Sequence, residues 1–242
     1  MSAPDPHADG STVLYAIGDV HGESQRLTQL HSLIFERHAL LYGELPMRLI
    51  HLGDYVDRGK DSKGVIDTLI ALDHRTDIDS VCLFGNHEAM MLAGLTHATP
   101  TAYETWLVNG GQQTLESYHA KGQQSVPEAH IKWLDSLPSI HVEAPRKLIF
   151  VHAGIDPNDY PNEREETYLW TRTSRFFDVA TWNNAALDGW TVVHGHTPTD
   201  DFYPDDQAAA ARRINIDTGA VFGGRLTAAI FAPGEDVGFI YA

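Results

Sequence analysis

The sequence predicts an α/β fold, in which helices pack on a parallel or mixed β-sheet. Two hydrophobic periods alternate along the first half of the chain. Short apolar runs that end at glycine are typical of strands, and stretches with apolar residues three and four positions apart are typical of helices. The resulting order, β-α-β-α-β, favours helices packed on one sheet. A length of 242 residues is sufficient for one domain with a large core.

The predicted elements of the first half follow one another regularly. Strands are predicted at 12–17, 48–52 and 80–84, and helices at 24–41 and 62–74. Helical sequence resumes after His87. The region at about 97–140 has helical spacing and no clear strand, so we expect a helical insertion or cap there.

The second half returns to strands. They are predicted at 147–151, 191–193, 213–216, 226–231 and 237–241, with polar loops at 156–166 and 200–211. At the other end of the chain, residues 1–11 are polar and contain two prolines. We expect these residues to form a disordered tail without a signal peptide, followed by a single domain over 12–242.

Composition limits the partners and the compartment. The net charge of −16 argues against a nucleic-acid partner and against docking on anionic lipid. No apolar run approaches the ~20 residues that cross a bilayer. The single cysteine, Cys82, excludes an intrachain disulfide and fits the reducing cytoplasm, where we expect the protein to reside. An anionic substrate would require local positive charge from bound metal or from a few arginines.

Five predicted strand ends carry Asp, Asn or His beside glycine. They are Gly18-Asp19-Val20-His21-Gly22, Gly53-Asp54-Tyr55-Val56-Asp57-Arg58-Gly59, Gly85-Asn86-His87-Glu88, His152-Ala153-Gly154 and His194-Gly195-His196. In open α/β sheets the carboxyl ends of strands form the crevice that binds ligands. One such aspartate is more often a turn residue or a helix cap. Five in succession predict a shared site.

The residue types at these strand ends indicate metal. Carboxylate, amide oxygen and imidazole suit borderline divalent ions such as manganese, iron and zinc. The groups are numerous enough for two ions, and Asp54 is the natural bridging carboxylate. Two ions ~3.5–4 Å apart can clamp a phosphoryl group and lower the pKa of a bound water. The sequence therefore predicts a two-metal phosphoesterase.

In this order the motifs resemble the phosphoprotein phosphatase (PPP) family of serine/threonine phosphatases, part of the metallophosphoesterase superfamily. The resemblance spans most of the chain and is closest to the bacterial and bacteriophage lambda phosphatase branch, which Trp106 to Gly111, Leu169 to Arg172 and Ile216 to Phe222 also resemble. It implies a calcineurin-like β-sandwich of two mixed sheets flanked by helices (αββα), with the active site at the C-terminal ends of strands.

The resemblance implies a ligand set for two ions. Asp19, His21 and Asp54 would hold the first, and Asp54, Asn86, His152 and His196 the second. Mn²⁺ is the expected metal, with Fe, Zn, Ni and Co as alternatives. A water or hydroxide activated between the two ions would attack phosphorus in line. No phosphoenzyme is expected.

The resemblance also implies the remaining catalytic roles. His87 would act as general acid and protonate the leaving oxygen, and Asp57 would orient it and support its charged form. Arg58 and Arg172 would grip the phosphate oxygens, because a guanidinium fork suits that geometry. Arg175, one helical turn beyond Arg172, could share or replace its role. The substrate is expected to be a phosphorylated protein or a small phosphoester.

Three alternatives remain open. A dinucleoside polyphosphate (Ap4A-type) hydrolase of the bacterial symmetrical type shares the metal motifs, but usually lacks the second aspartate of the second motif and has Asp after Gly-Asn-His. This chain has Asp57 and Glu88, which favours the protein phosphatase. An inactive metal-binding scaffold is disfavoured because every expected ligand and both arginines are present. A nuclease is disfavoured by the acidic charge.

Other polar residues are given structural roles. His194 is expected to be a strand-end histidine rather than a ligand, and Trp106 a core residue. Asp217 could orient a ligand histidine or serve a turn. His31 and His38 lie on a predicted helix and are expected to be solvated.

Overall fold

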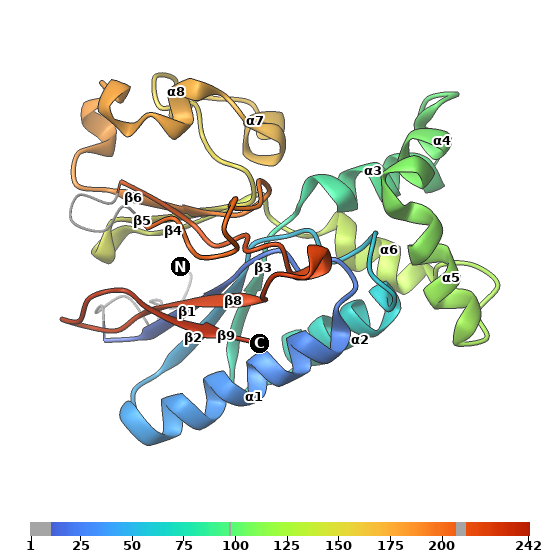
Figure 1. Ribbon diagram of the computed structural model, residues 1–242, viewed down its shortest axis with the longest axis horizontal. Coiled ribbons are helices and arrows are strands. Elements are labelled where there is room, and N and C mark those ends of the chain that lie inside the picture. The colour runs from blue at the N-terminus through green and yellow to red at the C-terminus, as the bar shows by residue number, and fades with distance from the viewer. Residues whose placement is uncertain (1–10, 97, 207–211) are drawn as a thin grey trace, which may run out of the picture.

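The computed structural model describes residues 11–96, 98–206 and 212–242. Two β-sheets stack face to face, and helices cover the outer face of each sheet (Figure 1). This arrangement is the αββα sandwich of two mixed sheets that was predicted. Of the predicted tail at 1–11, only Ser11 lies among the described residues. The division of the chain into a tail and one domain with an insertion stays a prediction.

The first sheet has the strand order β3-β2-β1-β8-β9. Its parallel strands are β1 (Val13–Ile17), β2 (Met47–His51) and β3 (Asp79–Cys82), and β8 (Thr227–Phe231) and β9 (Gly238–Tyr241) add antiparallel beside β1. Helices α1 (Ser24–Leu41) and α2 (Ser62–Asp73) follow β1 and β2 and lie on the outer face (Figure 1). Because β1, β2 and β3 are parallel, the loops that follow them leave at one edge.

The second sheet has the order β4-β5-β6-β7. The strands β5 (Leu148–Val151), β6 (Thr191–His194) and β7 (Arg213–Asn215) are parallel, and β4 (Ile140–Glu143) is antiparallel to β5. Short helices α7 (Glu165–Trp170) and α8 (Ser174–Phe177) lie on its outer face (Figure 1). Neither β4 nor these helices was predicted, because each is only four to six residues long and shows no full period.

Alternation along β1 explains how the layers pack. Val13, Tyr15 and Ile17 belong to the core between the first sheet and its helices. The intervening Leu14 and Ala16 belong to the core between the sheets, which also contains Ile50, Leu52, Phe150, Val193 and Ile216. Successive side chains of a strand point to opposite faces. Both faces of β1 are therefore apolar and buried.

The region at 97–140 is largely helical. It follows α3 (Asn86–Leu95) and contains α4 (Ala102–Trp106), a turn kinked at Gly110 (Leu107–Gly111), α5 (Gln112–Ala120) and α6 (Glu128–Asp135). These helices gather at one end of the sandwich, with α5 against α2 (Figure 1). Trp106, Tyr118 and Leu134 are fully buried and join the core of the first sheet. Among the described residues, none of the helices combines the length and apolarity needed to cross a bilayer.

The expectation that His31 and His38 are solvated is wrong. Each is 6% exposed, because positions 27, 31, 34 and 38 share the buried face of α1. The Nε2 atom of His31 lies 2.9 Å from Nε2 of His51, and Nδ1 of His38 lies 3.0 Å from the Tyr15 hydroxyl. Burial lowers the pKa of His31 to about 4. His31 is therefore neutral, and both histidines are hydrogen-bonding core residues.

Truncation of Phe150 should destabilise the sandwich. Its side chain is fully buried between the sheets, with its ring 5.8 Å from that of Phe231. We expect Phe150→Ala to lower the free energy of unfolding by about 3–5 kcal/mol, measured by urea denaturation. Val142→Ala, at a 41% exposed position of the neighbouring strand β4, is the control and should change it by less than about 0.5 kcal/mol. Equal effects would contradict this packing.

Candidate active site

The six predicted metal ligands come from loops of both sheets and converge at one edge. Asp19, His21, Asp54 and Asn86 follow strands of the first sheet, and His152 and His196 follow strands of the second. All six are buried, with at most 5% of any side chain exposed. Two groups of mutually close ligand atoms share Asp54: one contains His21 and His87, and the other His152 and His196.

Hydrogen bonds fix the protonation of His196 and Asn86. Arg172 Nε donates to His196 Nε2 at 2.9 Å, so that nitrogen is an acceptor. Burial lowers the pKa of His196 to about 2, so the ring is neutral and, while Arg172 donates to Nε2, carries its proton on Nδ1. The Nδ1 atom lies 2.8 Å from Oδ1 of Asn86, which therefore accepts a hydrogen bond. To hold an ion through Nδ1, the ring would have its proton on Nε2 instead, with Arg172 bonded to another acceptor.

The lone pair of His152 faces two further acceptors. Its Nδ1 donates to the Leu52 carbonyl at 2.9 Å, and burial lowers its pKa, so Nε2 carries no proton. The Nε2 atom lies 2.9 Å from Asn86 Oδ1 and 3.3 Å from Asp54 Oδ1. Two ligands of one ion at about 2.1 Å each are about 3.0–3.4 Å apart at ordinary coordination angles. The three acceptors thus fit a shared cation.

His21 is oriented in the same way. Its Nδ1 donates to the Val56 carbonyl at 2.8 Å, and Nε2 lies 3.4 Å from Asp54 Oδ2. Burial lowers the pKa of His21 to about 3, so Nε2 keeps its lone pair. A carbonyl on the far nitrogen of a ligand histidine is the usual way to set its tautomer. The side of Asp54 that faces His21 therefore also fits a divalent ion.

Two carboxyl groups lie close together next to these ligands. Burial and the nearby Asp217 raise the pKa of Asp19, and burial raises that of Asp217 to about 7. Asp19 accepts the backbone N–H of His196 at 3.1 Å, and Asp217 accepts that of Gly219 at 3.1 Å. Asp217 thus makes the predicted turn contact and also acts on a ligand. A bound cation would reverse the effect on Asp19.

Glu88 holds the loop that carries Asp54, a role that the sequence did not reveal. It is fully buried, and its carboxylate accepts the backbone N–H groups of Asp54, Tyr55, Val56 and Gly85 at 2.8–3.2 Å. Burial and Asp54 raise its pKa to about 8, while these amides lower it. Glu88 is also the third residue of α3, and its bond to the N–H of the N-cap residue Gly85 is one half of a capping box, since glycine has no side chain to form the other half. That helix-start position could have indicated it.

The backbone at the site is unusual for L-residues. Seven non-glycine residues among those described have a positive φ, and five of them belong to the site. These five are His21, Asp54, Asp57, Arg58 and His196. The left-handed region costs a residue with a Cβ about 1–2 kcal/mol. The surrounding contacts must therefore hold these loops in place.

The predicted catalytic residues are also assembled at this edge. His87 Nδ1 lies 2.7 Å from Asp57 Oδ2, and both side chains are buried. Arg58 Nη1 lies 2.6 Å from His21 Nε2, with its guanidinium 5.5 Å from the Phe222 ring centre. Arg172 bonds His196 through the side chain and the carbonyl group.

Two other candidates lie elsewhere. Arg175 pairs with Asp156 at 3.1 Å in a half-exposed ion pair, so of Arg172 and Arg175 it is Arg172 that contacts a predicted ligand. His194 packs on Phe176, with ring centres 4.9 Å apart, and its Nε2 lies 3.1 Å from Arg213. It is therefore a buried strand-end histidine, as expected, and not part of the ligand groups.

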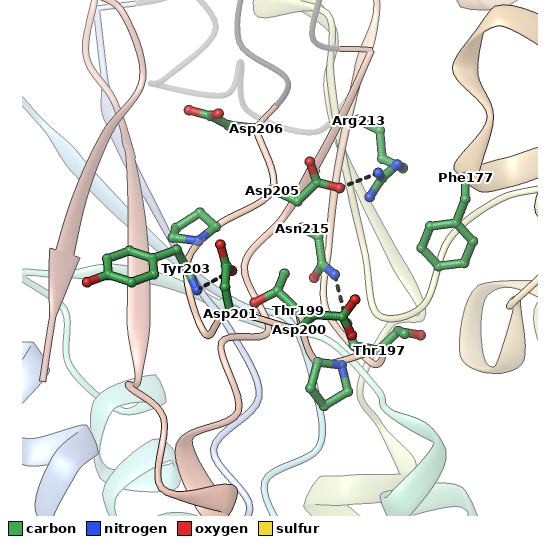
Figure 2. A pocket seen from close by; sticks show the side chains of 12 residues that line it. Phe177, Thr197, Thr199, Asp200, Asp201, Tyr203, Asp205, Asp206, Arg213 and Asn215 are labelled. Carbon is green, nitrogen blue, oxygen red and sulfur yellow. Dashed lines mark hydrogen bonds and ion pairs between the residues drawn. The ribbon is translucent and has the colours of Figure 1, made fainter.

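A cavity of about 720 Å³ begins at Thr197, directly after His196 (Figure 2). The loop at 197–206 forms most of its lining, with Arg213 and Asn215 from β7. Four aspartates face one arginine there: Asp200, Asp201, Asp205 and Asp206. Asp205 pairs with Arg213 (Figure 2). The remaining charge of the lining is negative, and the predicted ligands and catalytic residues are not among the residues that line this cavity.

Comparisons with known proteins agree with this arrangement. The protein is 26% identical over 246 residues to the asymmetrical bis(5'-nucleosyl)-tetraphosphatase PrpE of Anoxybacillus flavithermus, covering 91% of each chain. It is 28% identical over 228 residues to serine/threonine-protein phosphatase 1 of Salmonella typhimurium, covering 89% of this chain and 90% of the relative. Among solved structures, a candidate diadenosine tetraphosphatase aligns with a TM-score of 0.65 at 22% identity, over 97% of this chain and 95% of the other.

The family assignment rests on the greater part of the chain. Residues 12–224 match the calcineurin-like phosphoesterase family. That span includes every predicted ligand and both arginines, and the two stacked sheets are those of the similar structures. The chain therefore belongs to the calcineurin-like phosphoesterases, a family of metal-dependent hydrolases.

Proposed function

We propose that this hydrolase acts on phosphate monoesters, and specifically on phosphoserine and phosphothreonine of proteins. The observation that carries the proposal is the His87–Asp57 pair, held at 2.7 Å beside two ligand groups that share Asp54. The ligand groups suit phosphoryl transfer in general. The buried acid is useful where the leaving group needs a proton.

The ligands would be divided between two ions as the family resemblance implies. Asp19, His21 and Asp54 would hold one, and Asp54, Asn86, His152 and His196 the other, with Mn²⁺ as the proposed metal. Such ions, when bound, supply a water of lowered pKa and neutralise charge at the phosphoryl group. The lone pairs of His152 and Asn86, which face each other at 2.9 Å, support this assignment.

The remaining residues would bind the phosphate and move the proton. Arg58 and Arg172 now donate to the imidazoles of His21 and His196, and phosphate oxygens would take the place of these acceptors. His87 would donate its Nε2 proton to the departing oxygen, since its Nδ1 is held by Asp57. The Asp57 carboxylate would stabilise the charged imidazolium before the transfer.

Leaving-group chemistry favours a protein substrate. A serine or threonine alkoxide is a poor leaving group and benefits from a buried acid, whereas a nucleoside phosphate already leaves as a stable anion. This feature supports a monoester.

Asymmetrical hydrolysis of dinucleoside tetraphosphates is the second candidate. It is favoured by the PrpE relative, which aligns over 91% of this chain. The symmetrical type considered from the motifs alone is a different enzyme from that relative. The same ligand groups and arginines could bind an internal phosphate of a dinucleotide, so the difference lies in the substrate that the site prefers.

Direct competition of substrates separates the two candidates. With Mn²⁺ present, we expect kcat/KM for a phosphoserine peptide to exceed that for diadenosine tetraphosphate by tenfold or more, roughly the discrimination that a few contacts provide. Turnover of p-nitrophenyl phosphate checks that the preparation is active. A higher kcat/KM for the dinucleotide would reverse the assignment.

Removal of the proposed acid should spare the metals and slow the chemistry. We expect His87→Asn to keep the metal content, because His87 is not among the six proposed ligands, although its ring borders His21 and Asp54. Its kcat on the phosphoserine peptide should fall by about 10²–10⁴-fold. His74→Asn, at an exposed histidine, is the matched control and should leave kcat unchanged. A wild-type rate for His87→Asn on the peptide would exclude the role.

Removal of the bridging carboxylate should weaken both ions. Asp54 is the residue common to the two ligand groups, so Asp54→Asn takes a charge from each at once. We expect elemental analysis to find fewer than two ions per chain after dialysis, and kcat to fall accordingly. Asp135→Asn, at an exposed aspartate of α6, should retain both. A full complement in Asp54→Asn would show that this residue is not the bridge.

A further inference from the structure

We propose that Trp106 and Thr114, in the helical region at 97–140, are positioning residues for the general acid. They hold the carboxylate of Asp57, which in turn orients His87. The inference rests on the proposed role of His87. If it holds, the inserted helices help to orient the general acid, in addition to any role in covering the crevice.

Each oxygen of Asp57 has a separate task. Oδ2 contacts Nδ1 of His87 at 2.7 Å. Oδ1 accepts the Trp106 indole N–H at 2.9 Å and the Thr114 hydroxyl at 2.8 Å. Asp57 is fully buried, and a buried carboxylate depends on such donors because water does not reach it. The two donors therefore fix the rotation that aims Oδ2 at the acid.

Thr114 makes two hydrogen bonds to Asp57. Its hydroxyl accepts the backbone N–H of Asp57 at 2.8 Å and gives its own proton to Oδ1. The backbone N–H and the Oδ1 atom of Asp57 are thus both bonded to the same atom, Oγ1 of Thr114. Asp57 has a φ of 71°, a conformation that an L-residue keeps only under such restraint. Ser62 also accepts the Asp57 N–H, at 3.1 Å.

Trp106 is itself held by close packing. A Cβ at Gly111 would lie 2.5 Å from the indole ring, and one at Gly94 would lie 3.1 Å from it. Glycine at these positions lets the backbone approach both the ring and its neighbours. Because the side chain is fully buried and its N–H can only donate, the indole has a fixed direction. Trp106 is thus a core residue, as expected, and a donor as well.

The kinked turn Leu107–Gly111, between the two donors, lies against the loop that carries Asp57 and Arg58. Gly110, with a φ of 115°, accepts the backbone N–H of Arg58 at 3.2 Å. A Cβ there would lie 2.6 Å from that nitrogen and 3.1 Å from the Asp57 side chain. One turn therefore supports both the partner of the acid and a proposed phosphate-binding arginine.

The test uses leaving groups of different basicity. We expect Thr114→Val, and independently Trp106→Phe, to lower kcat about tenfold on the phosphoserine peptide, which needs the acid. On p-nitrophenyl phosphate, which needs it little, kcat should change by less than about twofold. Thr114→Ser should restore the peptide rate. Thr105→Val, at an exposed threonine of α4, should resemble the wild type on both substrates.

Other outcomes would overturn the inference. An equal loss on both substrates would mean that the two residues serve only folding, and an unchanged peptide rate would mean that Asp57 needs neither donor. His87→Asn is measured in parallel. If it shows the leaving-group dependence and the Trp106 and Thr114 variants do not, this inference fails alone. If His87→Asn shows none, the proposed acid fails with it.

Discussion

The packing of the two sheets against each other determines the geometry of the site. Asp54 and Asn86 belong to loops of the first sheet, and His152 and His196 to loops of the second. The layer between the sheets is apolar, and apolar burial provides attraction without direction. A directional contact is added where His152 donates to the Leu52 carbonyl across the layers. The ligand group of Asp54, His152 and His196 exists only while this contact between sheets holds.

A site of this kind places carboxylates in the buried interior of a protein that is already acidic. Asp19, Asp54 and Glu88 lie within a chain of net charge −16, and buried carboxylates are costly unless donors or cations meet them. The Glu88 carboxylate accepts hydrogen bonds from backbone amides. The imidazoles of His21 and His196, beside Asp54, accept hydrogen bonds from Arg58 and Arg172. The compensation is local. The positive charge of the site thus lies where an anionic substrate would arrive.

The sequence indicates most strands because they are short apolar runs, of which the first three end at a glycine, and the boundaries differ from the observed ones by at most two residues. The polar residues beside glycine that follow five of these runs also point to the six predicted ligands, which the structure brings to one edge. The missed strand β4 and helices α7 and α8 are too short to show a period.

The missed residues of the site are those that act across long stretches of chain. Thr114 lies 57 positions beyond Asp57, and Trp106 lies 49 beyond it. Nothing in local spacing joins them, because the contact depends on how α4 and α5 pack against the end of α2 and the loop before it. Glu88 is different, since its position at the start of α3 fits one half of a capping box. Its hold on the Asp54 loop still depends on tertiary structure.

The positive φ angles of the site carry a consequence for the history of this chain. At positions 21, 54, 57, 58 and 196 the backbone has a shape that suits glycine, so a glycine there would relax the fold while deleting a functional group. At these five positions, a substitution that raises thermal stability would therefore lower turnover. Selection for thermal stability alone, in nature or in a laboratory screen, would favour more stable but inactive variants of the same fold.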